Sequence, residues 1–147
     1  MYEQFSDPAR IVMRLAEQEA RHWKHEYLGP QHILLGLVKQ GSGVAANVLK
    51  NLDVDARLVA HQVQIIFELG NEPIPSAKLR LTPRAKTAIL FAMEEARGLH
   101  HEFVGTPHLL LGLRRDEESV AGQILMYFGI GLETLRQETA KLLGQHE

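Results

Sequence analysis

The chain has no cysteine, few aromatic residues and no excess of either charge: of its 147 residues, 6% are aromatic, 16 are Lys or Arg and 18 are Asp or Glu. The lack of cysteine excludes disulfide scaffolds, thiolate metal sites and cysteine nucleophiles. The lack of a basic excess argues against a sequence-independent grip on nucleic acid. The longest apolar run, residues 33–38, is far shorter than the ~20 residues that span a membrane, and the start shows no apolar signal-peptide region. We therefore expect a soluble, cytoplasmic protein with no nucleic-acid or membrane partner.

The patterns of common catalytic sites are absent as well. The sequence has no phosphate-cradling Gly-x-x-x-x-Gly-Lys-Ser/Thr run and no Gly-x-Ser-x-Gly elbow for an acyl-transfer serine. The paired carboxylates at 94–95 and 117–118 lie in polar helical stretches, where we expect them to be solvated. The sequence therefore predicts a protein that is not an enzyme and needs no cofactor, with a hydrolase of unrecognised type as the weakest alternative.

The strongest signal in the sequence is an internal repeat. Residues 5–68 align without a gap on residues 81–144, and the segment LGPQHILLGL at 28–37 falls on VGTPHLLLGL at 104–113. Identities extend well beyond these segments: Ala16/Ala92, Glu19/Glu95, Ala20/Ala96, Arg21/Arg97, His25/His101, Glu26/Glu102, Val44/Val120, Ala45/Ala121 and Leu49/Leu125. Such agreement at one fixed interval indicates a duplicated unit.

Each copy predicts four helices. The first helix of each copy follows a capping residue and has proline in its first turn, Ser6 with Pro8 and Thr82 with Pro83. Apolar residues then recur at spacings of three and four, which is typical of one helical stripe. The other helices are expected from Pro30 and Thr106 onward, over 43–51 and 119–128, and over 55–69 and 132–143. No useful stretch alternates with period two, so no strand is predicted.

These elements predict an all-α fold: two tandem, pseudo-symmetric four-helix repeats, about eight helices, sharing one core. Residues 5–69 form repeat one and 81–144 repeat two, joined by a linker at 70–80 whose first part is rich in Gly and Pro, within a single domain of residues 1–147. Short helices with alanine-rich faces need a second layer. Gly36 and Gly112 recur inside the second helices, where glycine costs about 1 kcal/mol relative to alanine, which indicates that another backbone passes close by.

Eight histidines raise the alternative of a helical protein that binds a metal or a small ligand. A helical pair such as His22–His25 binds Zn²⁺ when a further ligand converges on it, but no His-Glu-x-x-His run is present. The other histidines of interest are the adjacent pair His100–His101 and the residues that open the second helices, His32 and His108. Recurrence at the repeat interval favours structural use, as caps or as hydrogen bonds between helices, and predicts no metal site.

Two surface features indicate binding of another protein. One is a basic cluster, Lys78, Arg80, Arg84 and Lys86, set among Leu79 and Leu81. The other is the aromatic pair Tyr2 and Phe5 ahead of the first cap. Each has a plain alternative, a solvated helix entrance for the cluster and a staple of the helix start for Phe5. Aromatic and cationic side chains nevertheless dominate the anchors of protein interfaces.

The repeated Gly-x-x-His-Ile/Leu-Leu-Leu-Gly-Leu segments resemble the Clp N-domain family, the double four-helix module at the front of ClpC-type Hsp100 AAA+ unfoldases. Further motifs at 5–10, 41–46, 82–86 and 94–97 carry the resemblance, which covers residues 2–143. It implies a non-catalytic module that docks substrates or adaptors for a Clp-type unfoldase ring, or regulates that ring in trans. The family's ATPase modules are not part of this sequence, so a stand-alone protein and a piece of a longer unfoldase are both open.

The resemblance also implies two sites. Family members that recognise phosphoarginine have a glutamate before the motif histidine in each repeat, where this chain has Gln31 and Pro107. Neither residue offers a charge to a guanidinium, so we expect both sockets to be disabled. Pro30 also replaces the family's threonine, and with it the expected cap. The second family surface accepts small cyclic peptides and proteins, and its matching positions are Tyr2, Leu81 and Lys86.

Overall fold

The computed structural model describes residues 2–67 and 79–144, and the first repeat within it consists of four helices and a short strand. They are α1 (Asp7–His22), β1 (Tyr27–Leu28), α2 (Pro30–Gln40), α3 (Val44–Asn51) and α4 (Ala56–Ile66). The predicted extension of the fourth helix to residue 69 is wrong at residue 67, which is the C-cap of α4, and its last two positions lie outside the described residues.

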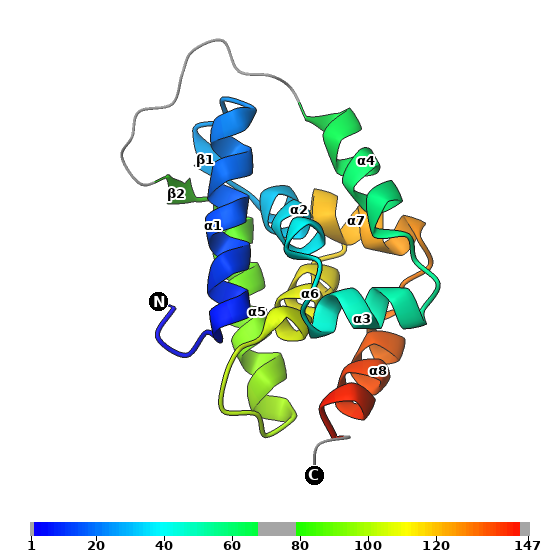
Figure 1. The fold of residues 1–147 in the computed structure, drawn as a ribbon. Helices are drawn as coiled ribbons and strands as arrows, with labels where there is room; N and C mark the ends of the chain where they lie inside the picture. The colour runs from blue at the N-terminus through cyan, green and yellow to red at the C-terminus, as the bar shows by residue number, and fades with distance from the viewer. Residues whose placement is uncertain (1, 68–78, 145–147) are drawn as a thin grey trace.

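The second repeat follows the same order (Figure 1): β2 (Arg80–Leu81), α5 (Pro83–Gly98), α6 (Thr106–Arg115), α7 (Val120–Tyr127) and α8 (Leu132–Gly144). The all-α class and the tandem repeats are therefore confirmed. Most of the predicted linker lies outside the described residues, but its last residue, Arg80, belongs to β2. In the described part of the chain, no helix is long and apolar enough to cross a membrane.

The predicted caps of the two long helices form. The Ser6 hydroxyl accepts a hydrogen bond from the Ala9 amide at 3.2 Å, and Thr82 accepts from the Ala85 amide at 3.1 Å. Proline follows within the first turn of both helices, where its missing N–H has no partner to lose. The buried stripe of α1 is Ala9, Val12, Met13, Ala16, Glu19 and Ala20, and α5 buries the equivalent positions.

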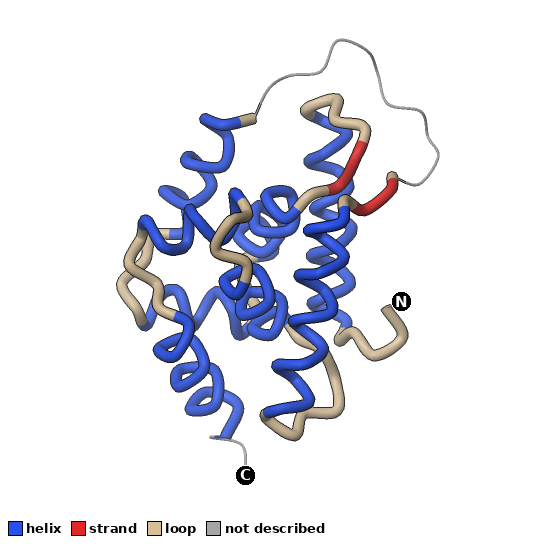
Figure 2. Tube along the Cα trace, turned by 180° about the vertical axis from the view of Figure 1, so that it is seen from behind, coloured by secondary structure: helices blue, strands red, loops and turns tan. Residues whose placement is uncertain are grey.

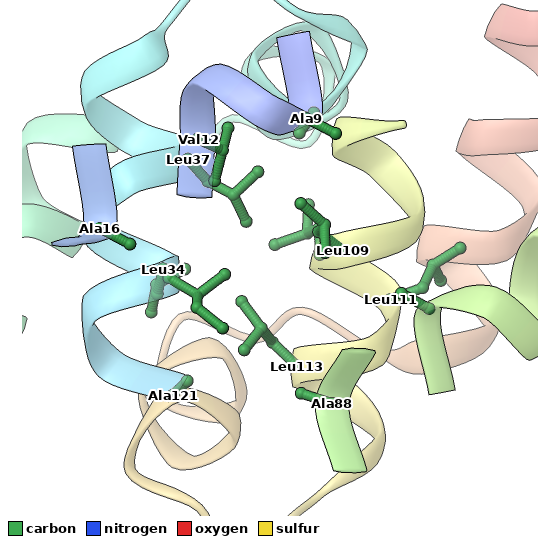
Figure 3. Packing of buried hydrophobic residues seen from close by; sticks show 14 of the residues in the cluster. Ala9, Val12, Ala16, Leu34, Leu37, Ala88, Leu109, Leu111, Leu113 and Ala121 are labelled. Carbon is green, nitrogen blue, oxygen red and sulfur yellow. The ribbon is translucent and has the colours of Figure 1, made fainter. Parts of the chain in front are cut away.

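The second helices of the two repeats, α2 and α6, lie at the centre of the molecule. Leu34 and Leu37 of α2 face Leu109 and Leu113 of α6, and the small side chains of α1, α5 and α7 close the space around them (Figure 3). All four leucines are almost completely buried. The two repeats thus share one hydrophobic core.

Alanine and glycine on facing helices let the backbones of each repeat approach closely. A Cβ added at Gly36 would lie 2.6 Å from the Val12 carbonyl oxygen of α1, and one at Gly112 would lie 2.3 Å from the Ala88 carbonyl oxygen of α5. Both distances are shorter than any normal carbon–oxygen contact. The expectation of a close backbone at these two glycines is confirmed.

The prediction of no strands is wrong in a small but informative way. β1 and β2 pair in parallel, with Leu28 opposite Leu81 (Figure 2). An isolated parallel bridge also joins Phe5 to Val104. By the repeat, Phe5 is equivalent to Leu81 and Leu28 to Val104, so each repeat supplies the partner of the other. Two-residue strands show no alternation to detect, and their partners lie in the other copy.

A second contact that crosses between the repeats caps α3. The amide of Ala45 donates to the Thr106 hydroxyl of α6 at 3.0 Å, whereas the equivalent helix α7 is capped by its own Ser119, which accepts from the Gly122 amide at 2.9 Å. Thr106 therefore caps the neighbouring repeat and not its own helix, whose N-cap is Gly105. Pro30, at the position equivalent to Thr106, has no hydroxyl to form such a cap, and the N-cap of α2 itself is Gly29.

Candidate functional site

A groove of about 1210 Å³ lies between α1, the two paired strands and the start of α5. Three of the residues expected to bind a partner, Tyr2, Leu81 and Lys86, line it. They come from the first residues of the chain and from the start of the second repeat. The pairing of β1 with β2 places the start of the second repeat beside β1, which itself packs against α1. We call this feature the α1–α5 groove.

The α1–α5 groove has an apolar floor and a charged rim. Met13 and Leu28 are buried at its base, and Ile11 and Tyr27 are large apolar side chains left exposed along it. The rim carries both signs, with Arg10, Arg14, Arg80 and Lys86 against Glu3, Asp7 and Glu17. Such a surface suits a polypeptide segment that buries apolar side chains and places charges beside the rim.

Tyr2 is held in place at one end of the groove. Its ring contacts that of Phe5 with centroids 4.9 Å apart, and its carbonyl accepts a hydrogen bond from the Phe5 amide at 3.0 Å. Burial, and then the negative charge of Glu17, raise the pKa of the Tyr2 phenol. The phenol is therefore neutral at physiological pH, and Phe5 fixes the position of the ring.

Two of the other expected binding residues, Phe5 and Arg84, do not line the groove. Phe5 is only 3% exposed and belongs to the core, so it acts on the groove through Tyr2. Arg84 points to the loop after α6, where its guanidinium contacts the Asp116 carboxylate at 2.7 Å and the Glu118 carboxylate at 3.3 Å. Lys78 lies outside the described residues. The basic cluster is thus divided, with Arg80 and Lys86 at the groove.

The sequence reasoning missed the contribution of α1 to the groove. Asp7, Arg10, Arg14 and Glu17 recur at spacings of three and four along the face of α1 opposite its buried stripe. This pattern looks like any solvated helix face. The exposed Ile11 is the one signal that could have drawn attention to it.

The repeated histidines His32 and His108 bind the N-cap amides of α2 and α6. His32 Nδ1 accepts the Gly29 amide at 2.9 Å and its Nε2 lies 2.8 Å from His25 Nδ1; His108 and His101 repeat the arrangement at 2.8 Å each. Because Nδ1 of His32 accepts, Nε2 carries the proton and donates to His25. Burial, and then the neighbouring histidine, lower the pKa of His32 and of His108 to about 4. The prediction of capping is confirmed for His32 and His108, whereas the second bond joins each of them to a loop residue and not to another helix.

His22 and His100 take no part in these contacts. His22 meets the Trp23 ring edge-on, with centroids 5.7 Å apart, and His100 adopts a left-handed backbone with φ of 60°. Among the residues that the structure describes, no three His, Asp or Glu side chains are grouped so as to hold a metal ion.

The two positions that the resemblance assigns to phosphoarginine pockets, Gln31 and Pro107, lie in the first turns of α2 and α6. Gln31 is half-buried and its amide oxygen lies over Gly29, where an added Cβ would meet it at 2.7 Å. Pro107 is buried. Neither side chain carries a charge.

The expectation of solvated carboxylates at 94–95 holds for Glu94, which is exposed, and is wrong for Glu95. Glu95 is 8% exposed, not solvated, because Arg136 of α8 and Arg115 of α6 both reach it, at 2.9 Å and 3.2 Å. Hydrogen bonding from Arg136 is the main cause of its lowered pKa. The equivalent Glu19 pairs with Lys39, the equivalent of Arg115. These ion pairs join helices within each repeat.

The interlocked four-helix repeats and the open groove define a helical repeat domain. The profile of the Clp repeat (R) N-terminal domain matches residues 4–128 and 80–147, and the chain belongs to this family. It is 41% identical over 147 residues to the Bacillus subtilis protein named "Negative regulator of genetic competence ClpC/MecB", covering all of this chain and 18% of that protein. The chain therefore spans under a fifth of that relative's length.

Solved structures share the fold at low identity. The N-terminal domain of Hsp104 from Candida albicans superposes with a TM-score of 0.78 at 19% identity, covering 97% of this chain and 93% of that one. A complex of the ClpV N-domain with a VipB peptide superposes with a TM-score of 0.77 at 15% identity, covering 96% and 88%. At these identities the likeness shows the fold alone.

Proposed function

We propose that the chain is a non-catalytic protein-binding module that docks substrates or adaptors for a Clp-type unfoldase, or regulates that unfoldase in trans. The observation that carries the proposal is the α1–α5 groove, in which Tyr2, Leu81 and Lys86 meet over an apolar floor. Membership of the Clp N-domain family supports it, as does the ClpV N-domain, whose complex with a peptide has the same fold. The site of action is the cytoplasm.

The groove is built for a peptide segment with an apolar anchor next to a charge. The anchor packs between Tyr2 and Leu81, above Met13 and Leu28, and an acidic side chain of the segment pairs with Lys86 or Arg80 on the rim. Lys86 is exposed and lies one turn into α5, so its ammonium reaches the groove without rearrangement. Partner capture therefore needs no covalent chemistry and no cofactor.

The test uses peptides selected from a display library on the immobilised protein, with binding then measured by fluorescence anisotropy. Tyr2→Ala and Lys86→Glu should each weaken binding by about 5- to 30-fold, which corresponds to about 1–2 kcal/mol for an interface anchor. Lys141→Glu makes the same charge change on the exposed side of α8 and should bind like the parent. Parent-like binding by both groove variants, with parent-like melting temperatures, would reject the groove.

The family's phosphoarginine activity is not part of this proposal. A guanidinium that met Gln31 or Pro107 would find a neutral amide or no polar group, and charge-assisted bonds are roughly twice as strong as neutral ones. Calorimetry with free phosphoarginine should therefore show no saturable binding. Restoring both acids, with Gln31→Glu and Pro107→Glu, supplies the matched comparison. Micromolar binding by the parent protein would contradict the expectation.

A further inference from the structure

The loops between the third and fourth helices have the same backbone in both repeats. The amides of Leu52, Asp53 and Val54 donate to Val48, Lys50 and Leu49, and the amides at 128, 129 and 130 repeat this pattern 76 positions on. Asp53 and Gly129 both adopt left-handed backbones, with φ of 59° and 75°. The Val54 carbonyl of repeat one therefore holds the place of the Ile130 carbonyl of repeat two.

In repeat two an arginine side chain occupies the space beneath this loop. Arg114, near the end of α6, donates from Nε to the Ile130 carbonyl at 2.6 Å. Its side chain is only 12% exposed, and its guanidinium lies 3.6 Å from the Glu117 carboxylate at the surface. The arginine stem is thus held between α6 and the loop, with its charged end at the rim.

In repeat one the equivalent of Arg114 is Val38, and the space is open. A cavity of about 450 Å³ lies there between α2, α3 and the start of α4, with Val38, Leu49 and Val54 among its walls. Within the described residues, no hydrogen bond to the Val54 carbonyl takes the place of the bond from Arg114. Asp53 and Asp55 also line the cavity, and Lys50 is the one basic residue among its lining residues.

We propose that this cavity receives an arginine side chain from a bound polypeptide, in the place that Arg114 fills from within the chain in repeat two. The apolar walls would hold the aliphatic stem, the Val54 carbonyl would accept from the guanidinium, and Asp53 at the rim would pair with its charge. Arginine suits the site better than lysine because a planar guanidinium can donate to the carbonyl and the carboxylate at once. Asp55 is already engaged by Arg57, so Asp53 is the acid available.

The cavity is separate from the α1–α5 groove. Its walls come from α2, α3 and α4, and Figure 1 shows α3 and α4 on the side of the molecule away from α1 and the N-terminus. None of its lining residues lines the groove. The inference goes beyond the proposed function and can fail or hold independently of it.

The experiment titrates the ¹⁵N-labelled protein with N-acetyl-arginine methylamide and follows the amide signals of residues 53–55. The citrulline analogue, which keeps the shape and loses the charge, and the lysine analogue are run beside it. We expect saturable shifts with the arginine probe, at least tenfold weaker binding of the other two, and weaker binding after Asp53→Asn. The absence of saturable shifts at 53–55, equal binding of citrulline, or tighter binding of free arginine than of the capped probe would each overturn the proposal.

Two reciprocal variants fill the cavity of repeat one and open the equivalent space of repeat two. Val38→Arg places in repeat one the side chain that repeat two already has, so it should close the cavity and weaken binding of the probe by more than tenfold while the fold is kept. Arg114→Val should open the equivalent space, where Gly129 replaces Asp53 and Glu117 is the acid within reach of a guanidinium, and it should add a second set of shifts at residues 129–131. Unchanged probe binding in a folded Val38→Arg protein would overturn the assignment of the cavity, whatever the result with Arg114→Val.

Discussion

At the scale of single residues, the close contact at Gly36 gives a prediction about stability. Gly36→Ala should lower the free energy of unfolding by about 1–3 kcal/mol, because its Cβ would lie 2.6 Å from the Val12 carbonyl oxygen and force α1 and α2 apart. Gly98→Ala in α5 is the matched control, since an added Cβ there meets no atom within 4 Å; it should leave stability unchanged or raise it by up to about 1 kcal/mol. Urea unfolding measures both, and an equal response of the two variants would count against the close approach.

The buried histidines predict how stability depends on pH. Their pKa of about 4 in the folded protein lies below the ordinary 6.5, so the unfolded chain binds more protons between these values. The contribution of each ring to the free energy of unfolding is complete above about pH 6.5 and is lost as the pH falls towards 4. Between pH 7 and pH 5 the loss is about 2 kcal/mol per ring.

The measurement is urea unfolding at both pH values, with an NMR titration of each ring. His32→Asn keeps an acceptor for the Gly29 amide but cannot titrate. It should therefore remove about half of the change in the free energy of unfolding that the two rings cause between pH 7 and pH 5. Protonation of the parent's His32 would put a proton on Nδ1 facing that amide, which is the geometric reason for the loss. A ring that titrates near 6.5 in the folded protein would contradict the prediction.

What the sequence could and could not predict at this scale follows from where each residue's partner lies. Gly36 and His32 were predictable because their contacts recur in both copies, so the repeat itself marks them as structural. Glu95 was not, because one of its partners, Arg136, is a residue that repeat one does not have; its equivalent there is Ala60. Phe5 was ambiguous for a related reason: its place in the core depends on the bridge to Val104, far along the chain.

At the scale of helices, the cap of α3 by Thr106 gives a prediction about coupling between the repeats. Thr106→Ala should cost about 1 kcal/mol, the usual value of an N-cap hydroxyl. Gly43→Ser supplies the residue that the equivalent helix α7 uses, but an added Cβ at Gly43 would lie 2.8 Å from the Thr106 hydroxyl, so this variant alone should also destabilise.

Combined, the two changes should partly cancel, because the serine can cap α3 once the Thr106 hydroxyl is gone. A double-mutant cycle of urea unfolding measures the coupling, which for residues in contact falls at about 0.5–3 kcal/mol. Strict additivity of the two single effects would show that Thr106 does not cap α3. The reverse substitution, Ser119→Gly, gives the comparison, because the cap that it removes lies within its own repeat.

Helix positions followed from capping residues, prolines and apolar spacing, all of which act within a few residues of sequence. The pairing of β1 with β2 did not, because two residues cannot display a period and their partner is in the other repeat. That pairing is also what builds the α1–α5 groove. Tyr2, Leu81 and Lys86 could be assigned to it only through the family resemblance, since nothing local connects residue 2 to residue 86.

At the scale of the whole molecule, the contacts between the two repeats make them one folding unit. Phe5 pairs with Val104, Leu28 with Leu81, and α2 packs on α6 through the shared leucines, so neither repeat can bury its apolar face alone. Interfaces of this kind give a single cooperative transition in domains of this size.

Trp23, the one tryptophan, lies in repeat one, and Gly112 lies in repeat two, so the cooperativity can be tested across the repeats. Gly112→Ala should destabilise repeat two directly, because its Cβ would lie 2.3 Å from the Ala88 carbonyl oxygen. If the repeats unfold together, Trp23 fluorescence and far-UV circular dichroism should give one urea midpoint in the parent and one lower midpoint in the variant. A fluorescence midpoint left at the parent's value, beside a circular dichroism curve in two steps, would mean that the repeats unfold separately, and the groove between them would then lose its rigid frame.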